Sequence, residues 1–186
     1  ENIECWGLMM NENGDLFVSD TESLAVKRWR KGEIGNRLKG TIVAGGNGQG
    51  NKRNQLHDPT YIFIDREEAV YIADRWTYRV MKWYKGASEG IVVVGGQGQG
   101  NNLNQISHPY GLIVNEIGDV YVADSDNNRV MCWPLGSKEG RVVVGGNGRG
   151  EESNQLNYAR GLSLDVEHNL YVADSTNNRV QRFRVA

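Results

Sequence analysis

The chain has 186 residues and a formal net charge of −2, with 21 Lys and Arg against 23 Asp and Glu. A chain of this length makes one ordinary domain with a sizeable core. Its balanced charge excludes a global attraction to nucleic acid or to an anionic membrane. No apolar run approaches the roughly 20 residues that a membrane-spanning helix needs, so we expect no membrane span.

Two cysteines are too few to define a redox compartment. Cys5 and Cys132 stand at different positions of the repeat described below, so we expect no disulfide between them. The sequence begins at Glu1 without a methionine, and we expect a mature product or an excised segment. The cellular location stays open, with an extracellular one favoured.

The sequence repeats itself four times, and such a repeat has to be recognised before any element is assigned. The pairs Gly45-Gly46, Gly95-Gly96 and Gly145-Gly146 recur every fifty residues, as do the aspartates that end YIAD, YVAD and YVAD. A first copy ends FVSD at Asp20 and carries four extra residues within KGEIGNRLKG (31–40), where the second copy has KGASEG (85–90). We predict a single repeat region over 1–186, with approximate units at 6–46, 60–96, 110–146 and 160–186.

Each unit has the pattern of four short strands, and the third copy shows them most clearly. Its residues 111–115, 120–124, 129–133 and 141–144 are rich in β-branched and aromatic side chains and are bounded by turn residues. The fourth copy follows the same order but lacks the outer strand. No stretch shows a helical period, so we predict an all-β chain. An Asx residue ends each first strand and is expected to cap the following turn rather than line a channel: Asn11, Asp65, Asn115 and Asp165.

Tandem four-stranded units near fifty residues long are typical of a β-propeller. One such sheet cannot hide both of its faces, whereas stacking it against its neighbours does. An aromatic column in the third strands should pack between blades: Trp29, Trp83, Trp133 and Phe183. We therefore predict an all-β propeller of four-stranded antiparallel blades, about four of them here, with the last one incomplete.

The pattern that includes YVADSxNNRV resembles the NHL repeat. The motif is clearest in copies three and four; copy two keeps Asp74 and Arg79 but loses both Asn, and copy one has Ala25 in place of the Arg. The resemblance implies a propeller that commonly has six blades, for which roughly 300 residues would be needed. We therefore expect an arc or fragment of a larger propeller, which self-associates or is completed by further blades because its edges are unpaired.

The motif DSDNNRV (124–130) and its copies are interpreted as structural residues that form the turn between the second and third strands. The Asp accepts backbone N–H bonds in the turn, the Asn tolerates a left-handed conformation, and the Arg pairs with the Asp of its own or an adjacent blade. A metal site would need several oxygen ligands that converge from one loop, so we predict no metal and no cofactor. The set of structural turn and blade residues is Asp20, Asp74, Arg79, Asp124, Asn128, Arg129, Asp174, Asn178 and Arg179.

The glycine-rich segments GGNGQGN, GGQGQGN and GGNGRGE are interpreted as connections between blades. A phosphate cradle would need a helix N-terminus after the loop, and the sequence shows none. Leu56, Ile106 and Leu156 should pin these connections to the core.

Alternating strand directions place the turns after the second strands and the long connections between blades on one face. We predict that this face binds a protein or glycan, because copy two replaces small polar turn residues by large ones that the fold does not require. The predicted ligand-binding residues are Arg75, Trp76, Tyr78, Tyr110, Tyr158 and Arg160. The alternative is that Trp76 and Tyr78 fold onto a neighbouring blade.

The predicted function is a non-catalytic interaction or scaffold module, and two alternatives stay open. The resemblance extends to propeller enzymes with a central metal, for which His57, His108 and Asp58 are the nearest candidates. It extends also to RNA-binding propellers, although nucleic acid is not the expected partner. The cations available for RNA are Lys27, Arg28, Arg30, Lys31, Arg37 and Lys39, which we interpret as a solvated edge.

Overall fold

A computed structural model describes residues 3–32 and 39–185 of the chain. These residues divide into two compact units, 1–93 and 94–186. Each unit is described by itself below. The remaining residues include Glu33 and Arg37, so part of the predicted basic edge lies outside the described residues.

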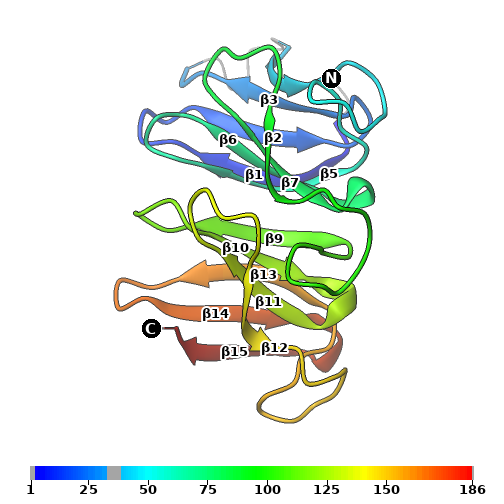
Figure 1. Cartoon of the computed structure of the whole chain (residues 1–186). Coiled ribbons are helices and arrows are strands. Elements are labelled where there is room, and N and C mark those ends of the chain that lie inside the picture. The colour runs from blue at the N-terminus through cyan, green and yellow to red at the C-terminus, as the bar shows by residue number, and fades with distance from the viewer. Residues whose placement is uncertain (1–2, 33–38, 186) are drawn as a thin grey trace. The chain divides into compact units, whose positions relative to one another are not determined.

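The first unit is built from two antiparallel sheets, called blades 1 and 2 (Figure 1). Blade 1 contains β1 (Cys5–Met10), β2 (Leu16–Asp20), β3 (Ala25–Trp29) and β4 (Thr41–Gly45). Blade 2 contains β5 (Pro59–Ile64), β6 (Val70–Asp74), β7 (Arg79–Trp83) and β8 (Ile91–Gly95), whose last residues pass into the second unit. The first strands of the two blades, β1 and β5, lie side by side.

The second unit repeats this plan with blades 3 and 4. Blade 3 contains β9 (Pro109–Val114), β10 (Val120–Asp124), β11 (Arg129–Trp133) and β12 (Arg141–Gly145). Blade 4 has three strands, β13 (Ala159–Leu164), β14 (Asn169–Asp174) and β15 (Arg179–Arg184). Here too the first strands, β9 and β13, are neighbours (Figure 1).

Strands follow one another in chain order in every sheet, and the all-β propeller class predicted from the sequence is confirmed. The only helices among the described residues are the short 3₁₀ turns η1 (Arg75–Thr77), η2 (Ser125–Asn127) and η3 (Ser175–Asn177). None of them has the length and hydrophobicity that crossing a membrane requires.

The first strand of each blade differs from the prediction. In blade 3 it begins at Pro109 and ends at Val114, instead of covering 111–115, because a bulge lets Pro109 pair with Asp124. The Asx residue that follows this strand caps its turn: Asn115 Oδ1 accepts a hydrogen bond from Asp119 N at 2.8 Å. Asn11, Asp65 and Asp165 accept the equivalent bond at the same distance.

The core of each unit lies between its two blades. In the first unit, Phe17 and Val26 of blade 1 belong to one cluster with Ile62, Ile72 and Trp83 of blade 2. The inner strands can approach closely because β1 carries Gly7, where a Cβ would lie 2.6 Å from the carbonyl oxygen of Thr60. In the second unit a corresponding cluster joins Val130 to Leu170 and Val172.

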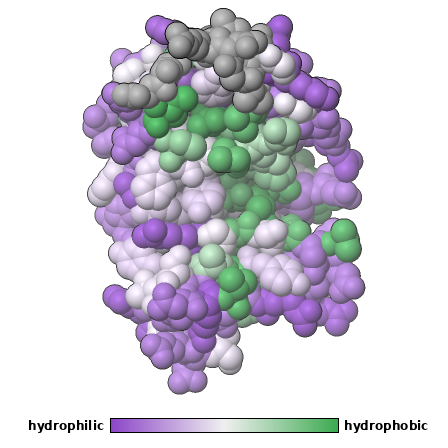
Figure 2. All heavy atoms as spheres, turned by 180° about the vertical axis from the view of Figure 1, so that it is seen from behind, coloured by the Kyte–Doolittle hydropathy of each residue, from purple (hydrophilic) through white to green (hydrophobic). Residues whose placement is uncertain are grey.

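The predicted aromatic column is buried to different degrees. Trp83 and Trp133 are 1% and 2% exposed, Phe183 packs at the margin of the second cluster, and Trp29 is half-buried. Hydrophobic side chains also reach the surface, and Figure 2 shows a group of them bordered by hydrophilic side chains. The blades therefore do not cover all of the apolar surface that they present.

Leu56 anchors the connection between blades 1 and 2 to the core. It is fully buried in the first core cluster, as predicted. We expect Leu56→Ala to lower the free energy of unfolding by about 2–5 kcal/mol, because the cavity left in the core cannot refill. Leu103→Ala, at a side chain that is 47% exposed in the next connection, should change it by no more than about 0.5 kcal/mol. Equal losses in chemical denaturation would contradict this assignment.

Candidate functional site

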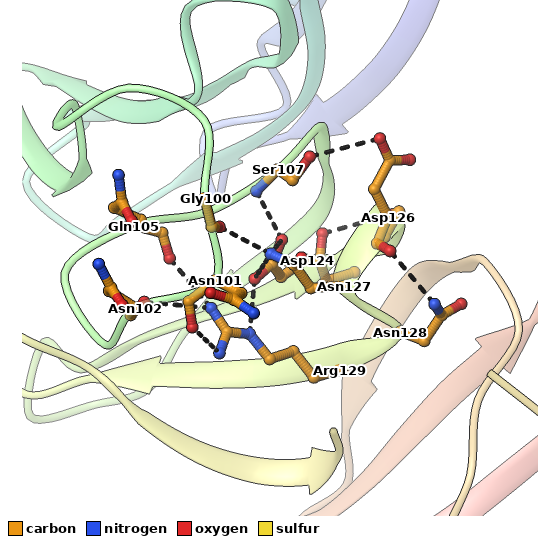
Figure 3. Close-up of polar contacts among 12 residues, drawn as sticks. Gly100, Asn101, Asn102, Gln105, Ser107, Asp124, Asp126, Asn127, Asn128 and Arg129 are labelled. Carbon is orange, nitrogen blue, oxygen red and sulfur yellow. Dashed lines mark hydrogen bonds and ion pairs between the residues drawn. The ribbon is translucent and has the colours of Figure 1, made fainter. Parts of the chain in front are cut away.

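The second strand of each blade ends at a buried aspartate that organises the turn after it. In blade 3, Asp124 accepts hydrogen bonds from Ser107 N at 2.6 Å, from the side-chain amide of Asn127 at 2.9 and 3.0 Å, and from Arg129 Nε at 2.7 Å (Figure 3). Both carboxylate oxygens are thus satisfied without contact with water. This is the environment that a fully buried charge requires.

Arg129 connects this carboxylate to the segment that enters the blade. Its two terminal nitrogens donate to the backbone carbonyls of Asn101, Asn102 and Gln105, at 2.7, 3.2 and 3.1 Å (Figure 3). Arg79 and Arg179 make the same contacts in blades 2 and 4. The arginine therefore joins the Asp of its own blade to the preceding connection, and its planar fork suits several carbonyls at once.

Blade 1 has no arginine at this position, and a lysine from elsewhere on β3 takes its place. Lys27 Nζ lies 2.8 Å from Asp20 Oδ2, and Lys27 is only 6% exposed. The interpretation of Lys27 as part of a solvated basic edge was therefore wrong, because the buried Asp20 needs a cation. A comparison of repeat columns could have indicated this burial, since copies two and three carry the apolar residues Met81 and Met131 at the position of Lys27. In blade 4, Gln181 at that position likewise donates to the aspartate, Asp174.

The residue before strand three has positive φ in every blade, whichever side chain it carries. Asn128 and Asn178 have φ of 51° and 50°, and Leu24 and Tyr78 both have 53°. The turn therefore imposes the left-handed conformation on residues that disfavour it. Asn128 adds a link between blades, since its Oδ1 accepts a hydrogen bond from Tyr158 N at 3.1 Å.

The clearest cluster of exposed aromatic side chains in the first unit surrounds Arg75. Its guanidinium carbon lies 5.3 Å from the ring centroid of Trp76 and 5.8 Å from that of Trp6. Trp76 and Trp6 are 46% and 42% exposed. The cluster thus combines two accessible indole rings with one cation at a distance suited to cation–π attraction.

Asp58 and His57 form the base of this cluster. Asp58 pairs with Arg75 Nε and is buried. Burial raises the pKa of its carboxyl group, against the lowering effect of the Arg75 guanidinium. His57 lies 2.7 Å from Gln49 Nε2, and its ring centroid is 6.3 Å from that of Trp76. Arg75 is consequently fixed at its inner end while the Trp rings face solvent.

In the second unit the predicted ligand residues are arranged differently. The Arg160 guanidinium lies 5.1 Å from the ring centroid of Tyr110, and Tyr110 is only 7% exposed. Tyr110 therefore presents little surface to a ligand, contrary to its interpretation as an exposed anchor. Tyr158 is 36% exposed, and the negative charge of Asp126 raises the pKa of its phenol.

The six predicted residues thus divide between the units, with Arg75, Trp76 and Tyr78 in the first. Within that unit the prediction missed Trp6, which stands at the repeat position of Tyr110 and Arg160. Extending that column to the first copy would have found it.

The groups considered for catalysis do not assemble into a metal site. His108 Nδ1 contacts Asp126 Oδ2, and Ser107 Oγ donates to the same carboxylate oxygen at 3.3 Å. His57 and His108 belong to different units. Within the part of the chain that the structure describes, no three His, Cys, Asp or Glu side chains are grouped so that they could hold a metal ion. Cys5 and Cys132 are free thiols.

Comparisons with known proteins bear on the family. Residues 156–183, which include most of blade 4, match the model of the NHL repeat. The resemblance predicted from the YVADSxNNRV pattern is confirmed there. No curated protein sequence matches the chain.

Three solved structures share the fold at low sequence identity. An auxiliary nutrient binding protein from Bacteroides thetaiotaomicron VPI-5482 has a TM-score of 0.70 and 15% identity, over 95% of this chain and 46% of that one. A nidogen/laminin complex has a TM-score of 0.71 and 16% identity, over 97% of this chain and 60% of that one. A streptogramin B lyase has a TM-score of 0.63 and 12% identity, over 97% of this chain and 51% of that one. The chain thus spans about half the length of the proteins it resembles. These proteins include a binding protein and an enzyme, so the likeness shows the fold alone.

The buried ion pair of blade 3 gives a first prediction for this framework. Arg129→Met should lower the free energy of unfolding by about 3–5 kcal/mol, because Asp124 would keep a buried charge without its partner. Arg179→Met should cost less, since the Arg179 side chain is 30% exposed against 7% for Arg129 and water can replace it. Chemical denaturation of both variants checks the order, and a larger loss for Arg179→Met would contradict it.

The equivalent aspartates of blades 3 and 4 should also respond oppositely to pH. Burial acts to raise the pKa of Asp174, but hydrogen bonds from Asn157 N, Arg179 and Asn177 hold it below its ordinary value. The stabilisation by Asp174 is then present above the unfolded pKa of about 3.9 and is lost as pH falls through the folded value. The difference in unfolding free energy between the wild type and Asp174→Asn should shrink as pH falls from about 5 to 2.

Asp124→Asn is the matched comparison. Burial raises the pKa of Asp124 above its ordinary value, so its contribution is largest below the unfolded pKa and declines as pH rises through the folded one. The two variants should therefore give pH profiles of opposite slope in denaturation experiments. Parallel profiles would show that the two sites are electrostatically alike.

Proposed function

We propose that the chain is a non-catalytic binding module. Its turns and blade connections bind a protein, with a glycan as the second candidate ligand. The observation that carries the proposal is the pair of exposed indole rings, Trp6 and Trp76, whose centroids lie 5.8 and 5.3 Å from the guanidinium carbon of Arg75. The proposal also covers Tyr78 in the first unit, and Tyr158 and Arg160 in the second, as contributors.

The exposed tryptophan of blade 2 is unnecessary for the fold. At the position of Trp76, blades 3 and 4 carry Asp126 and Thr176, and both build the same 3₁₀ turn. Arg75 likewise replaces the serines that stand in blades 3 and 4. A fold that repeats its framework and varies these two residues leaves them available for recognition.

The cluster has the composition of a protein-binding hot spot. Trp, Tyr and Arg are enriched among the residues that dominate interface energetics. An indole ring adds a large contact area at little entropic cost, because few torsions are frozen. Because Asp58 holds Arg75 in place, the Arg75 side chain loses little conformational entropy on binding, which favours affinity.

The comparisons are compatible with this class without naming a ligand. One similar structure is described as an auxiliary nutrient binding protein and another as a nidogen/laminin complex. The RNA alternative is weakened because Arg28 lies 3.8 Å from Glu68 and Lys27 is buried against Asp20. No arrangement of the described residues specifically favours the enzyme alternative.

A binding comparison between single-residue variants tests the proposal. The wild type, Trp6→Ala and Trp76→Ala are applied to a protein array and to a glycan array. Tyr84→Ala is the control, since Tyr84 is 54% exposed but lies beyond strand β7, at the opposite end of blade 2. Binding to the wild-type targets should weaken about thirtyfold for Trp76→Ala, as expected of a hot-spot residue worth about 2 kcal/mol.

Trp6→Ala should weaken the same targets, and Tyr84→Ala should leave them unchanged. Targets on the protein array would support a protein ligand, and targets on the glycan array alone would replace it with a glycan. If the Trp variants and Tyr84→Ala bind equally well, the cluster is not the recognition site. Circular dichroism of each variant shows whether the fold is retained.

A further inference from the structure

Arg160 is the one cation in a repeat column that the other blades fill with uncharged residues. The column holds Trp6 in blade 1, Thr60 in blade 2 and Tyr110 in blade 3. Those three blades form without a charge at this position, so the framework does not require the guanidinium of Arg160. Arg160 is the second residue of β13, at the edge of blade 4 that carries the 3₁₀ turn η3, and it is exposed. It therefore lies on the face proposed for binding.

The guanidinium of Arg160 lies over an aromatic ring. Its carbon is 5.1 Å from the ring centroid of Tyr110, which belongs to the neighbouring first strand of the same unit. Tyr110 is only 7% exposed, so its ring is a fixed support. Within the part of the chain that the structure describes, the Arg160 side chain makes no hydrogen bond and no ion pair. Its exposed N–H groups are therefore available to a ligand.

The contact with Tyr110 restricts the guanidinium before a ligand arrives. An exposed arginine samples many rotamers, and a ligand that fixes one of them has to offset the lost side-chain entropy. Cation–π attraction to the Tyr110 ring limits this loss for Arg160. The N–H groups of a guanidinium form a planar fork, which matches the two oxygens of a carboxylate.

The charges beside this arginine favour a singly charged ligand group over a doubly charged one. Tyr158 is 36% exposed, and the negative charge of Asp126 raises the pKa of its phenol, against a lowering effect of Arg149. A carboxylate and a second cation therefore both lie near Tyr158. Asp126 would repel a dianionic phosphate more strongly than a carboxylate, and phosphate sites in proteins use clusters of arginines.

We propose that Arg160, supported by Tyr110, binds a carboxylate in an acidic segment of a protein partner. The ligand group is the side chain of a glutamate or an aspartate, held by two parallel N–H···O bonds. The inference rests on the proposed function, because it takes the partner to be a protein. It names the chemistry that the second unit recognises, and it makes no use of Trp6 and Trp76 in the first unit.

Titration of the full chain with a short acidic peptide tests the proposal. The probe is hexaglutamate with blocked ends, and hexaglutamine with the same end groups is its uncharged counterpart. Binding to the isotope-labelled protein is followed by NMR, through the backbone amide signals of Tyr110 and Tyr158. The arginine Nε–H signal that is absent from Arg160→Lys belongs to Arg160, and hexaglutamate should shift it in the wild type.

Arg160→Gln should weaken the binding of hexaglutamate about fivefold, because one bidentate pair at the surface is lost. Arg160→Lys keeps the charge without the fork, so its affinity should lie between those of the wild type and Arg160→Gln. The matched control is Arg184→Gln, which removes the same charge from an exposed residue at the opposite end of blade 4. It should change the affinity by less than about twofold, because salt screens a charge at that distance.

Two substitutions of Tyr110 test the support. Tyr110→Phe keeps the ring face and should leave the affinity for hexaglutamate unchanged. Tyr110→Leu removes the ring and should weaken the binding about threefold. Circular dichroism shows whether each variant keeps its β structure. If Tyr110→Leu does not fold, the comparison of Arg160→Gln with Arg184→Gln decides, since both of those residues are exposed.

Three results would overturn the proposal. The first is equal affinity of Arg160→Gln and Arg184→Gln for hexaglutamate. The second is a wild type that binds hexaglutamine as tightly as hexaglutamate, or that binds neither at millimolar concentration. The third is saturation by inorganic phosphate or by an oligogalacturonate where hexaglutamate does not bind, because the ligand would then be a phosphate or an acidic glycan.

The outcomes separate this inference from the proposed function. If Trp76→Ala loses the protein-array targets and hexaglutamate binding does not depend on Arg160, only the present inference fails. If Trp76→Ala keeps those targets while Arg160→Gln weakens hexaglutamate binding, the Arg75 cluster is not the recognition site and the inference on Arg160 stands.

Discussion

The buried carboxylate at the end of each second strand is the constraint on which the rest of the structure depends. A charge that has left water must be paired and hydrogen-bonded from every side. Asp124 meets this demand with a backbone amide, an Asn side chain and a guanidinium. Because Arg129 also reaches the carbonyls of Asn101 and Gln105, the same ion pair fixes the turn and the connection into the blade.

A framework fixed in this way tolerates variation in the turn residues that point away from it. Blade 2 keeps the contact of Arg79 with Asp74 and replaces the small residues between them by Arg75 and Trp76. The 3₁₀ turn and the left-handed residue after it are preserved, even with Tyr78 in that conformation. Blade 1 shows the same tolerance in the partner itself, where Lys27 stands in for the arginine. Recognition can thus change while the scaffold stays constant.

The repeat also explains why apolar surface is left over. A four-stranded sheet has two apolar sides, and each blade hides one of them only against a neighbour. Within the first unit Ile62 is covered, and the equivalent Leu8 is not. Val180 marks the same situation in blade 4, which also lacks the strand that pairs with the third strand in the other blades.

The sequence by itself determined the fold class, the period of the blades and the residues that build the turns. These features repeat, and each is set by neighbours a few positions away: the Asx caps, the Asp that ends strand two and the Arg that begins strand three. Only the tertiary structure decided that Lys27 is buried against Asp20, that Tyr110 is covered and that Trp6 joins Arg75. Those outcomes depend on side chains that meet across strands and blades, and a residue's identity does not specify which groups will surround it.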